Sequence, residues 1–279
     1  MHTTKRWHQV VYLVLALLIA VICFFPIYWM LVSSLLPTSK VLSTNPAIIP
    51  ALADVNVAAY REVFGRSNVA VWFRNSVIVT VGSVGLSMVV SILAGYALSR
   101  MKSRGQTVAG IAMLLTRVLP ATLLVIPLYI TYSSLHLLDS LWGLILANCT
   151  VIIPFSVWLM KGFFDSIPFE LEEAASIDGC GIFGAFWRVV LPLTLPGLGA
   201  TTAYAFVLAW SDYLFVRTFI RDQNLWTMTV GAASFIGEHA VEWASLMAVG
   251  VIGILPVAVI FLFLEPLLVR GLAGGAVKG

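Results

Sequence analysis

Long hydrophobic stretches, separated by shorter polar ones, dominate the pattern of this sequence. Six of them are about 20 residues or longer, the length that a helix needs to cross the hydrocarbon core of a bilayer. They cover residues 10–32, 75–99, 108–132, 141–160, 198–219 and 244–264. They are far longer than strands and lack strict alternation, so they predict spanning helices rather than a barrel. Prolines inside four of these stretches predict kinks.

Composition supports a membrane protein. The chain has 279 residues, of which 60% are hydrophobic and 10% are charged, whereas a soluble domain averages about 25% charged residues. We therefore expect an all-α integral membrane protein with six transmembrane helices, organised as a single domain over residues 1–279. The small net charge of +3 does not indicate nucleic-acid binding, and the spacing of Cys and His residues indicates no metal site.

The distribution of Lys and Arg predicts the orientation. These residues favour the side of the N-terminus, and the short loop 99–104 carries three of them, Arg100, Lys102 and Arg104. We therefore expect a multi-pass protein of the inner or plasma membrane, with both termini in the cytoplasm. The polar loop 166–197 and the tail 270–279 then also face the cytoplasm.

The stretch 169–196 interrupts the hydrophobic pattern with four acidic residues and several Gly and Pro residues. It predicts two short helices joined at Gly179, the first starting near Pro168 and the second ending at Pro192. A polar element that projects from a membrane is typical of a docking surface for a soluble partner. The alternative is a loop lying on lipid headgroups, which its acidity disfavours, since anionic lipids attract Lys and Arg.

This stretch resembles the EAA loop of the permeases of ATP-binding-cassette (ABC) importers. Glu173-Ala174-Ala175 is followed after three residues by Gly179, and after nine more by Val189, one residue and Leu191-Pro192. The one departure is Val189, where the family usually has isoleucine. Other segments look like the carbohydrate-importer branch: 25–30, 33–35, 75–76, 96–100, 117–120 and 142–144. The final residues, 271–279, are similar to the tail of the maltose-type second permease subunit.

The resemblance implies a type I importer permease fold and a translocation subunit with no catalytic residues of its own. In that family the loop enters a cleft on the ATP-binding subunit, and the tail also reaches the ATP-binding dimer. The implied coupling residues are Glu172, Glu173, Ala174, Ala175, Asp178, Gly179, Leu191 and Pro192. The implied tail contacts are Gly275, Val277, Lys278 and Gly279.

The implied partners are a second homologous permease, two ATP-binding-cassette subunits, an external solute-binding protein and membrane lipid. The chain contains no Gly-Lys dipeptide and hence no Walker A phosphate loop. ATP and Mg are therefore expected on the partner subunits, with no cofactor and no metal bound by this chain.

Polar residues inside the predicted spans mark a possible solute path, because an ionisable group at membrane depth is costly unless it is paired or hydrated. The candidates are Arg117, Asn148, Thr150, Trp210, Asp212 and Tyr213. A carboxylate can accept sugar hydroxyls, and an aromatic ring can stack on a sugar face. The alternative is structural: an Arg117–Asp212 pair, or hydrogen bonds to the companion permease.

The sequence thus predicts a permease that translocates a di- or oligosaccharide or a related solute by alternating access. Two other functions stay open, import of glycerophosphodiesters or glycerol phosphates and ion-coupled transport without an ATPase. Two local expectations concern helix ends. Asn75 and Ser76 are expected to cap the second span, and Glu265-Pro266 is expected to stop the sixth.

Overall fold

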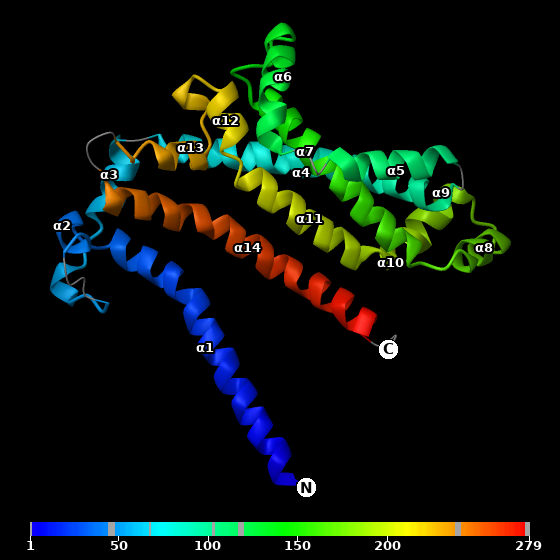
Figure 1. The fold of residues 1–279 in the computed structure, drawn as a ribbon, viewed down its shortest axis with the longest axis horizontal. Helices are drawn as coiled ribbons and strands as arrows, with labels where there is room; N and C mark the ends of the chain where they lie inside the picture. The colour runs from blue at the N-terminus through cyan, green and yellow to red at the C-terminus, as the bar shows by residue number, and fades with distance from the viewer. Residues whose placement is uncertain are drawn as a thin grey trace. The chain divides into compact units, whose positions relative to one another are not determined.

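The structure is a computed structural model that describes residues 2–43, 48–66, 68–101, 104–116, 120–237 and 241–276. Over these residues its regular elements are helices, accompanied by one isolated antiparallel bridge between Ile236 and Val241. The chain divides into two compact units, and Figure 1 shows the order of the helices along the chain. Unit 1 comprises Met1–Ala70 and Gly231–Leu255, and unit 2 comprises Val71–Val230 and Pro256–Gly279.

Unit 1 consists of one long helix followed by short ones. Its elements are α1 (His2–Ser34), α2 (Thr38–Val41), the 3-10 turn η1 (Leu52–Asp54), α3 (Ala58–Arg66) and the first part of α14 (Trp243–Ala276). The Ser34 and Tyr60 hydroxyls share a hydrogen bond of 2.8 Å, which joins the end of α1 to α3. An ion pair between Lys40 and Asp54 ties α2 to η1.

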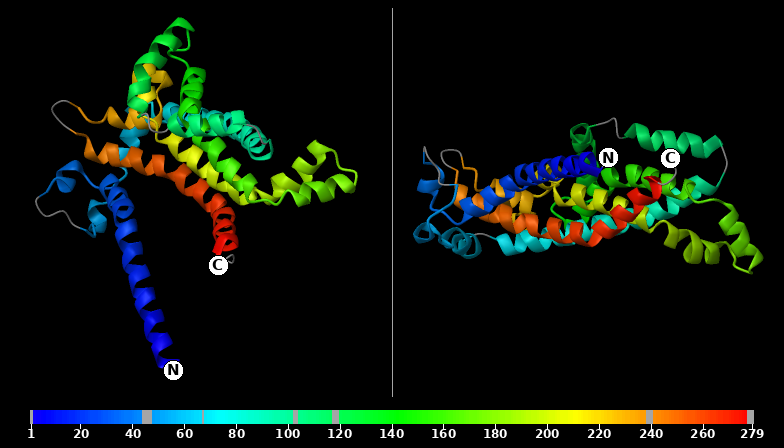
Figure 2. Two further views of the ribbon diagram at one scale, coloured as in Figure 1. Left: turned by 45° about the vertical axis from the view of Figure 1, so that its right-hand side comes forward. Right: turned by 90° about the horizontal axis from the view of Figure 1, so that it is seen from below.

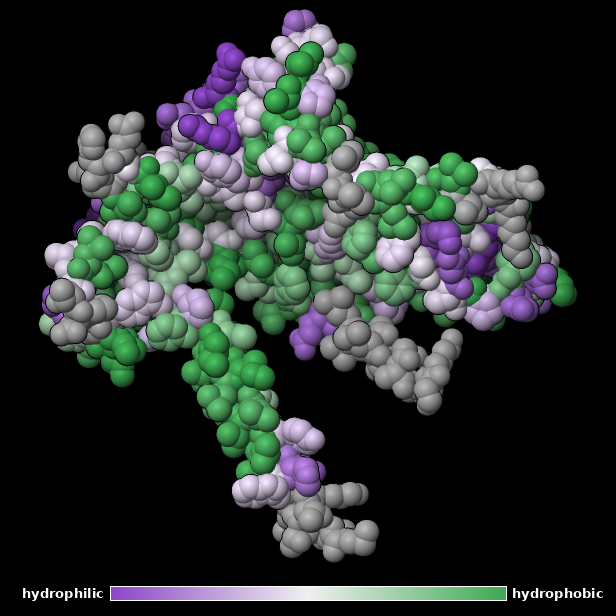
Figure 3. Space-filling view, in the orientation of Figure 1, coloured by the Kyte–Doolittle hydropathy of each residue, from purple (hydrophilic) through white to green (hydrophobic). Residues whose placement is uncertain are grey.

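Helix α1 presents hydrophobic side chains to its surroundings along most of its length (Figure 3). The most hydrophobic part of this helix has no residue buried by the rest of the chain. Leu13, Ile22 and Phe24, for example, are each about two-thirds exposed. Such a surface is stable only against lipid or another membrane protein.

Unit 2 contains most of the remaining helices (Figures 1 and 2). They are α4 (Val69–Arg100), α5 (Arg104–Thr116), α6 (Ala121–Ser134), α7 (Leu141–Asp165), α8 (Glu170–Ile177), α9 (Ile182–Ala185), a π turn (Phe186–Val190), α10 (Leu191–Leu193), α11 (Leu195–Trp210), α12 (Leu214–Phe219), the 3-10 turn η3 (Gln223–Leu225) and α13 (Met228–Ala233). Helix α7 lies at the centre, in contact with α5, α6, α11 and α12.

Small residues let α4 approach α7 closely. The Gly82 and Gly95 backbones lie so near α7 that an added Cβ would come within 2.6 Å of Ile145 and 2.9 Å of Met160, respectively. On the same helix, Ser83 and Ser87 are fully buried and donate to the Ile145 carbonyl and the Cys149 sulfur, both at 3.4 Å. Close contact through small residues is how helices associate in membranes, where hydrophobicity alone gives little preference for protein over lipid.

The helices account for the predicted spans in different ways. Four helices of the described chain are individually long and hydrophobic enough to cross a bilayer, and two bent helix pairs raise the total to six. The spans 10–32, 75–99, 141–160 and 244–264 each fall inside one helix, namely α1, α4, α7 and α14. The span 108–132 is divided between α5 and α6, and the span 198–219 is broken at 211–213 between α11 and α12.

Both expectations about helix ends are wrong. Helix α4 begins at Val69, six residues before Asn75, so Asn75 and Ser76 cannot cap it. The Asn75 amide instead donates to the backbone carbonyls of Asn224 and Trp226, at 2.8 and 3.0 Å. Helix α14 continues through Pro266 to Ala276, because in a membrane a proline kinks a helix without having to end it.

The contact between α4 and α7 predicts the effect of one methyl group. In Gly95→Ala the new Cβ would lie 2.9 Å from Met160 Cβ and 3.0 Å from the Lys161 backbone nitrogen. We expect this variant to lower the free energy of unfolding by about 1–3 kcal/mol. Gly85→Ala, on the same helix with nothing within 4 Å, is the control and should be neutral or stabilising by about 0.5–1 kcal/mol. Thermal unfolding in detergent measures both, and equal stability of the two variants would contradict the prediction.

Candidate functional site

The polar segment between α7 and α11 projects from one end of the helices of unit 2 (Figure 2). We refer to residues 170–193 as the α8–α10 segment. Three acidic residues, Glu170, Glu172 and Glu173, occupy the first turn of α8, where the partial positive charge of the helix N-terminus favours them. The prediction of two short helical pieces joined at Gly179 is confirmed.

Gly179 makes the turn between the two pieces. Its φ is +85°, a conformation that strains any residue with a side chain. Its N–H donates to the Ser176 carbonyl at 3.1 Å, and the Cys180 N–H donates to the Ala175 carbonyl at 2.9 Å. These bonds satisfy the last carbonyls of α8, as in the usual glycine-terminated helix.

The second piece ends one residue beyond Pro192, where its end was expected. It runs from α9 through the π turn into α10 and stops at Leu193, where the chain bends by 72° at Thr194 into α11. Pro192 has no N–H to donate to the carbonyl four residues earlier, and the wider π turn immediately before α10 absorbs this defect in the hydrogen-bond ladder.

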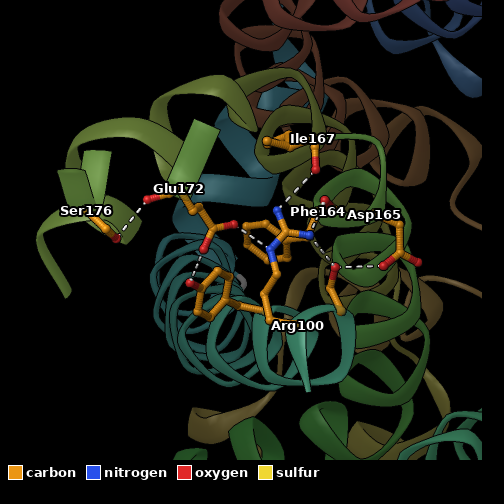
Figure 4. Close-up of polar contacts among 8 residues, drawn as sticks. Arg100, Phe164, Asp165, Ile167, Glu172 and Ser176 are labelled. Carbon is orange, nitrogen blue, oxygen red and sulfur yellow. Dashed lines mark hydrogen bonds and ion pairs between the residues drawn. The ribbon is translucent and has the colours of Figure 1, made fainter. Parts of the chain in front are cut away.

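Glu172 faces inward, unlike most of the predicted coupling residues. Its side chain is part of a buried polar cluster, and the residue is 7% exposed (Figure 4). One carboxylate oxygen accepts from Arg100 Nε at 2.5 Å, and the other accepts from the Tyr96 hydroxyl at 2.6 Å. The Tyr96 ring in turn packs on Phe164 and Phe186. Glu172 therefore ties α8 to α4 and is not available to a partner.

Arg100 and Tyr96 belong to this site although the sequence did not predict them as site residues. Both lie in the last two turns of α4. In the sequence they belonged to segment 96–100, which resembles the carbohydrate-importer branch, and Arg100 was one of the basic residues that indicated the cytoplasmic side. Their contact with Glu172 spans more than 70 residues of sequence, so no local pattern could reveal it. The available signal was an arginine at the end of a span, opposite an acidic loop.

The remaining predicted coupling residues lie mainly on the outer surface of the segment. Glu173, Ala174, Asp178, Gly179 and Pro192 are exposed, Leu191 is half-buried, and Ala175 is buried. Beside them stand large hydrophobic side chains with unusually high exposure. Ile177, Ile182 and Phe183 are 87%, 75% and 82% exposed, and Trp187 is 61% exposed. An exposed hydrophobic patch bordered by carboxylates is typical of a protein-binding surface.

The predicted tail contacts are described only in part. Gly275 lies in the last turn of α14, whereas Val277, Lys278 and Gly279 lie outside the described residues. Among the residues that the structure describes, no group of three or more His, Cys, Asp or Glu side chains could hold a metal ion.

A cavity of about 340 Å³ lies where the helix breaks between α11 and α12. Three of the predicted path residues, Asn148, Asp212 and Tyr213, line it. The rest of its lining comprises Ala121, Val151, Ile152, Leu208, Ser211, Leu214 and Phe215. Irregular backbone at membrane depth occurs where it lines a water-filled cavity or is buried in protein, and the break at 211–213 lines this cavity.

Asp212 holds the break in place. One carboxylate oxygen accepts from the Phe215 N–H at 3.1 Å, which caps the start of α12, and the other accepts from the Asn148 amide at 3.4 Å. The Asp212 backbone carbonyl accepts from the Thr229 hydroxyl at 2.6 Å. The carboxylate, the neighbouring amide and the Tyr213 phenol could together hydrogen-bond solute hydroxyls.

Two of the other predicted path residues, Thr150 and Trp210, do not line this cavity. The Thr150 hydroxyl donates to the Ala147 carbonyl of its own helix at 2.6 Å. Trp210 is 9% exposed and packs between Phe73 and Phe206. Neither lines the cavity, and Arg117 lies outside the described residues.

Comparison with known proteins places these features in context. Residues 87–274 match the family described as binding-protein-dependent transport system inner membrane component. The chain is 32% identical over 255 residues to the diacetylchitobiose uptake system permease protein DasC of Streptomyces coelicolor, covering 91% of this chain and 92% of DasC. It is 34% identical over 259 residues to the sulfoquinovosyl glycerol transport system permease protein SmoH of Agrobacterium fabrum, covering 91% and 89%.

The fold also matches a solved structure. A chain from the crystal structure of a bacterial ABC transporter involved in the import of the acidic polysaccharide alginate superposes with a TM-score of 0.78. The match covers 94% of this chain and 97% of the other, at 23% sequence identity. The agreement over nearly the whole length shows that the two chains share a fold.

The positive φ of Gly179 predicts a local cost for a side chain. Gly179→Ala should destabilise the α8–α10 segment by about 1–2 kcal/mol, because an alanine there is strained. Gly181→Ala is the matched control, since Gly181 has a φ of −70° and open space at its Cβ position. Hydrogen exchange of the intact chain in detergent should rise in residues 170–193 of the first variant alone. Equal exchange in the two variants would contradict the prediction.

Proposed function

This chain belongs to the family of binding-protein-dependent transport system inner membrane components, and we propose that its solute is a di- or oligosaccharide or a related glycoside. It is a multi-pass membrane permease subunit of an ABC importer. Such an importer receives its solute from a solute-binding protein. The observation that carries the choice of solute class is the similarity to DasC and SmoH over about nine-tenths of the chain.

In this proposal the chain is not an enzyme, and energy comes from two separate ATP-binding subunits that hold ATP and Mg. The absence of a Walker A loop from the sequence supports this division of labour. The complete importer would also contain a second, homologous permease and would be surrounded by lipid. The hydrophobic, unburied surface of α1 fits contact with either of these.

The α8–α10 segment would dock on an ATP-binding subunit. Supporting this role are the exposed Glu173 and Asp178 and the hydrophobic Ile182 and Phe183, which are 75% and 82% exposed. Burying side chains of this size at an interface contributes much of the binding free energy, whereas exposed charges mainly set specificity. The tail contacts from Gly275 to Gly279 would add a second attachment.

Transport would proceed by alternating access. ATP binding would close the ATP-binding dimer, the docked segments would move with it, and the membrane helices would open to the outside. Hydrolysis would then restore the inward-facing state. The cavity at Asp212 would hold solute during this cycle, with the carboxylate and the Asn148 amide facing hydroxyl groups.

The function is tested on the complete complex, comprising both permeases, the ATP-binding subunits and the binding protein, reconstituted in proteoliposomes. ATPase activity is measured with diacetylchitobiose, other disaccharides and glycerol-phosphate derivatives. Stimulation by a disaccharide supports the proposal, whereas stimulation by glycerol-phosphate derivatives alone would replace the solute class. Uptake that survives ATP depletion and collapses with the ion gradient would instead identify an ion-coupled transporter.

Docking makes a prediction about Phe183. Phe183→Asp should weaken binding of the ATP-binding subunit tenfold or more, a loss of at least about 1.4 kcal/mol at a central hydrophobic contact, and the amount that co-purifies with the permease should fall accordingly. Phe64→Asp, the same change at a 59% exposed site in α3, is the control and should leave the subunit bound. Retention of the ATP-binding subunit by the Phe183 variant would rule out this surface.

The solute path makes a prediction about Asp212. Asp212→Asn keeps the shape and the acceptor for Phe215 N–H but removes the charge, so uptake should show about a tenfold weaker apparent affinity for solute. Thr150→Val, outside the cavity, should transport normally. Dose–response curves of uptake in proteoliposomes compare the two, and full affinity in Asp212→Asn would assign this carboxylate a purely structural role.

A further inference from the structure

We propose that Arg100 is a positioning residue that joins α4, α7 and α8 into one mechanical unit, so that force on the docking surface reaches the membrane helices. The inference rests on the proposed docking of the α8–α10 segment. It adds a role for a residue that does not contact the ATP-binding subunit. Arg100 would act through Glu172, which is a residue of helix α8 in the docking segment.

A single guanidinium group connects the three helices (Figure 4). Arg100 leaves the last turn of α4 and donates to Glu172 of α8 through Nε. Its two terminal nitrogens donate to the Phe164 and Ile167 carbonyls, at 3.1 and 3.2 Å. The Phe164 carbonyl lies in the last turn of α7, where carbonyls lack donors from their own helix. The Ile167 carbonyl lies just after the end of α7. The planar fork of arginine suits several acceptors held at fixed angles, which the point charge of lysine cannot match.

The cluster is shielded from water, so its hydrogen bonds and ion pair are costly to break. The side chains of Arg100 and Glu172 are 13% and 9% exposed. Removing either partner would leave a poorly hydrated charge, which is strongly unfavourable. Tyr96, one turn earlier on α4, completes the cluster. Its hydroxyl donates to the Glu172 carboxylate, and the centre of its ring lies 4.7 Å from the centre of the Phe186 ring. The same tie therefore contacts both pieces of the α8–α10 segment.

A neighbouring ion pair provides the contrast. Lys161 and Asp165 lie one turn apart on α7 and are 34% and 43% exposed. An exposed pair within one helix contributes little to stability. Asp165 also accepts from the Ser99 hydroxyl of α4 at 2.7 Å, and a change at Lys161 leaves this bond and those of Arg100 in place. Lys161→Gln is therefore the matched control for Arg100→Gln.

The test uses the complete complex in proteoliposomes and the disaccharide that best stimulates the wild-type ATPase. Solute imported and ATP hydrolysed are measured together, and their ratio reports coupling. We expect Arg100→Gln and Glu172→Gln each to lower this ratio about tenfold while the ATP-binding subunits stay bound and basal ATPase persists. The double variant should be no worse than the worse single one, because both remove the same tie. Lys161→Gln should keep the wild-type ratio.

Tyr96→Phe keeps the ring and removes only the hydroxyl, so it should fold normally and lower the ratio severalfold. If the Arg100 variant fails to assemble, Tyr96→Phe and Glu172→Gln still test the inference. A wild-type ratio of solute imported to ATP hydrolysed in both of these variants overturns it. Effects that multiply in the Arg100–Glu172 double variant also overturn it. A wild-type complex without disaccharide-stimulated ATPase would refute the proposed function instead, which keeps the two failures distinct.

Discussion

The buried ion pair between Arg100 and Glu172 determines how the projecting segment is attached to the helices of unit 2. A carboxylate with so little exposure is stable only because an arginine and a tyrosine hydroxyl pair with both of its oxygens. The arginine in turn supplies donors to the end of α7. The attachment of α8 to α4 and to the end of α7 therefore depends on one charge from a helix distant in sequence.

The sequence predicted the membrane class, the spans and the turn at Gly179 because each rests on a local property. Length and hydrophobicity specify a spanning helix, and glycine tolerates a positive φ. The expectation at Pro266 failed because it treated proline as a helix stop. The surroundings of a membrane helix allow the chain to stay helical there.

Side-chain placement was less predictable than helix placement. Asn148 and Thr150 are both polar and two residues apart on α7, yet one lines the cavity and the other bonds its own helix. Trp210, at the end of α11, packs among aromatic rings, whereas Asp212, within the break, lines the cavity. These candidates were chosen for their polarity at membrane depth, and polarity does not tell which of them face the cavity. Arg100 was missed because its partner is 72 residues away.

The π turn at residues 186–190 determines where the α8–α10 segment can lose a residue. A π turn contains about one residue more than an α turn, so it takes up a surplus residue locally. Deleting one residue there would restore an ordinary helix and leave Leu191 and Pro192 facing much as they do now. The same deletion in the regular helix α11 would rotate every later residue of that helix by about 100°, so the segment should tolerate a one-residue deletion best at its π turn.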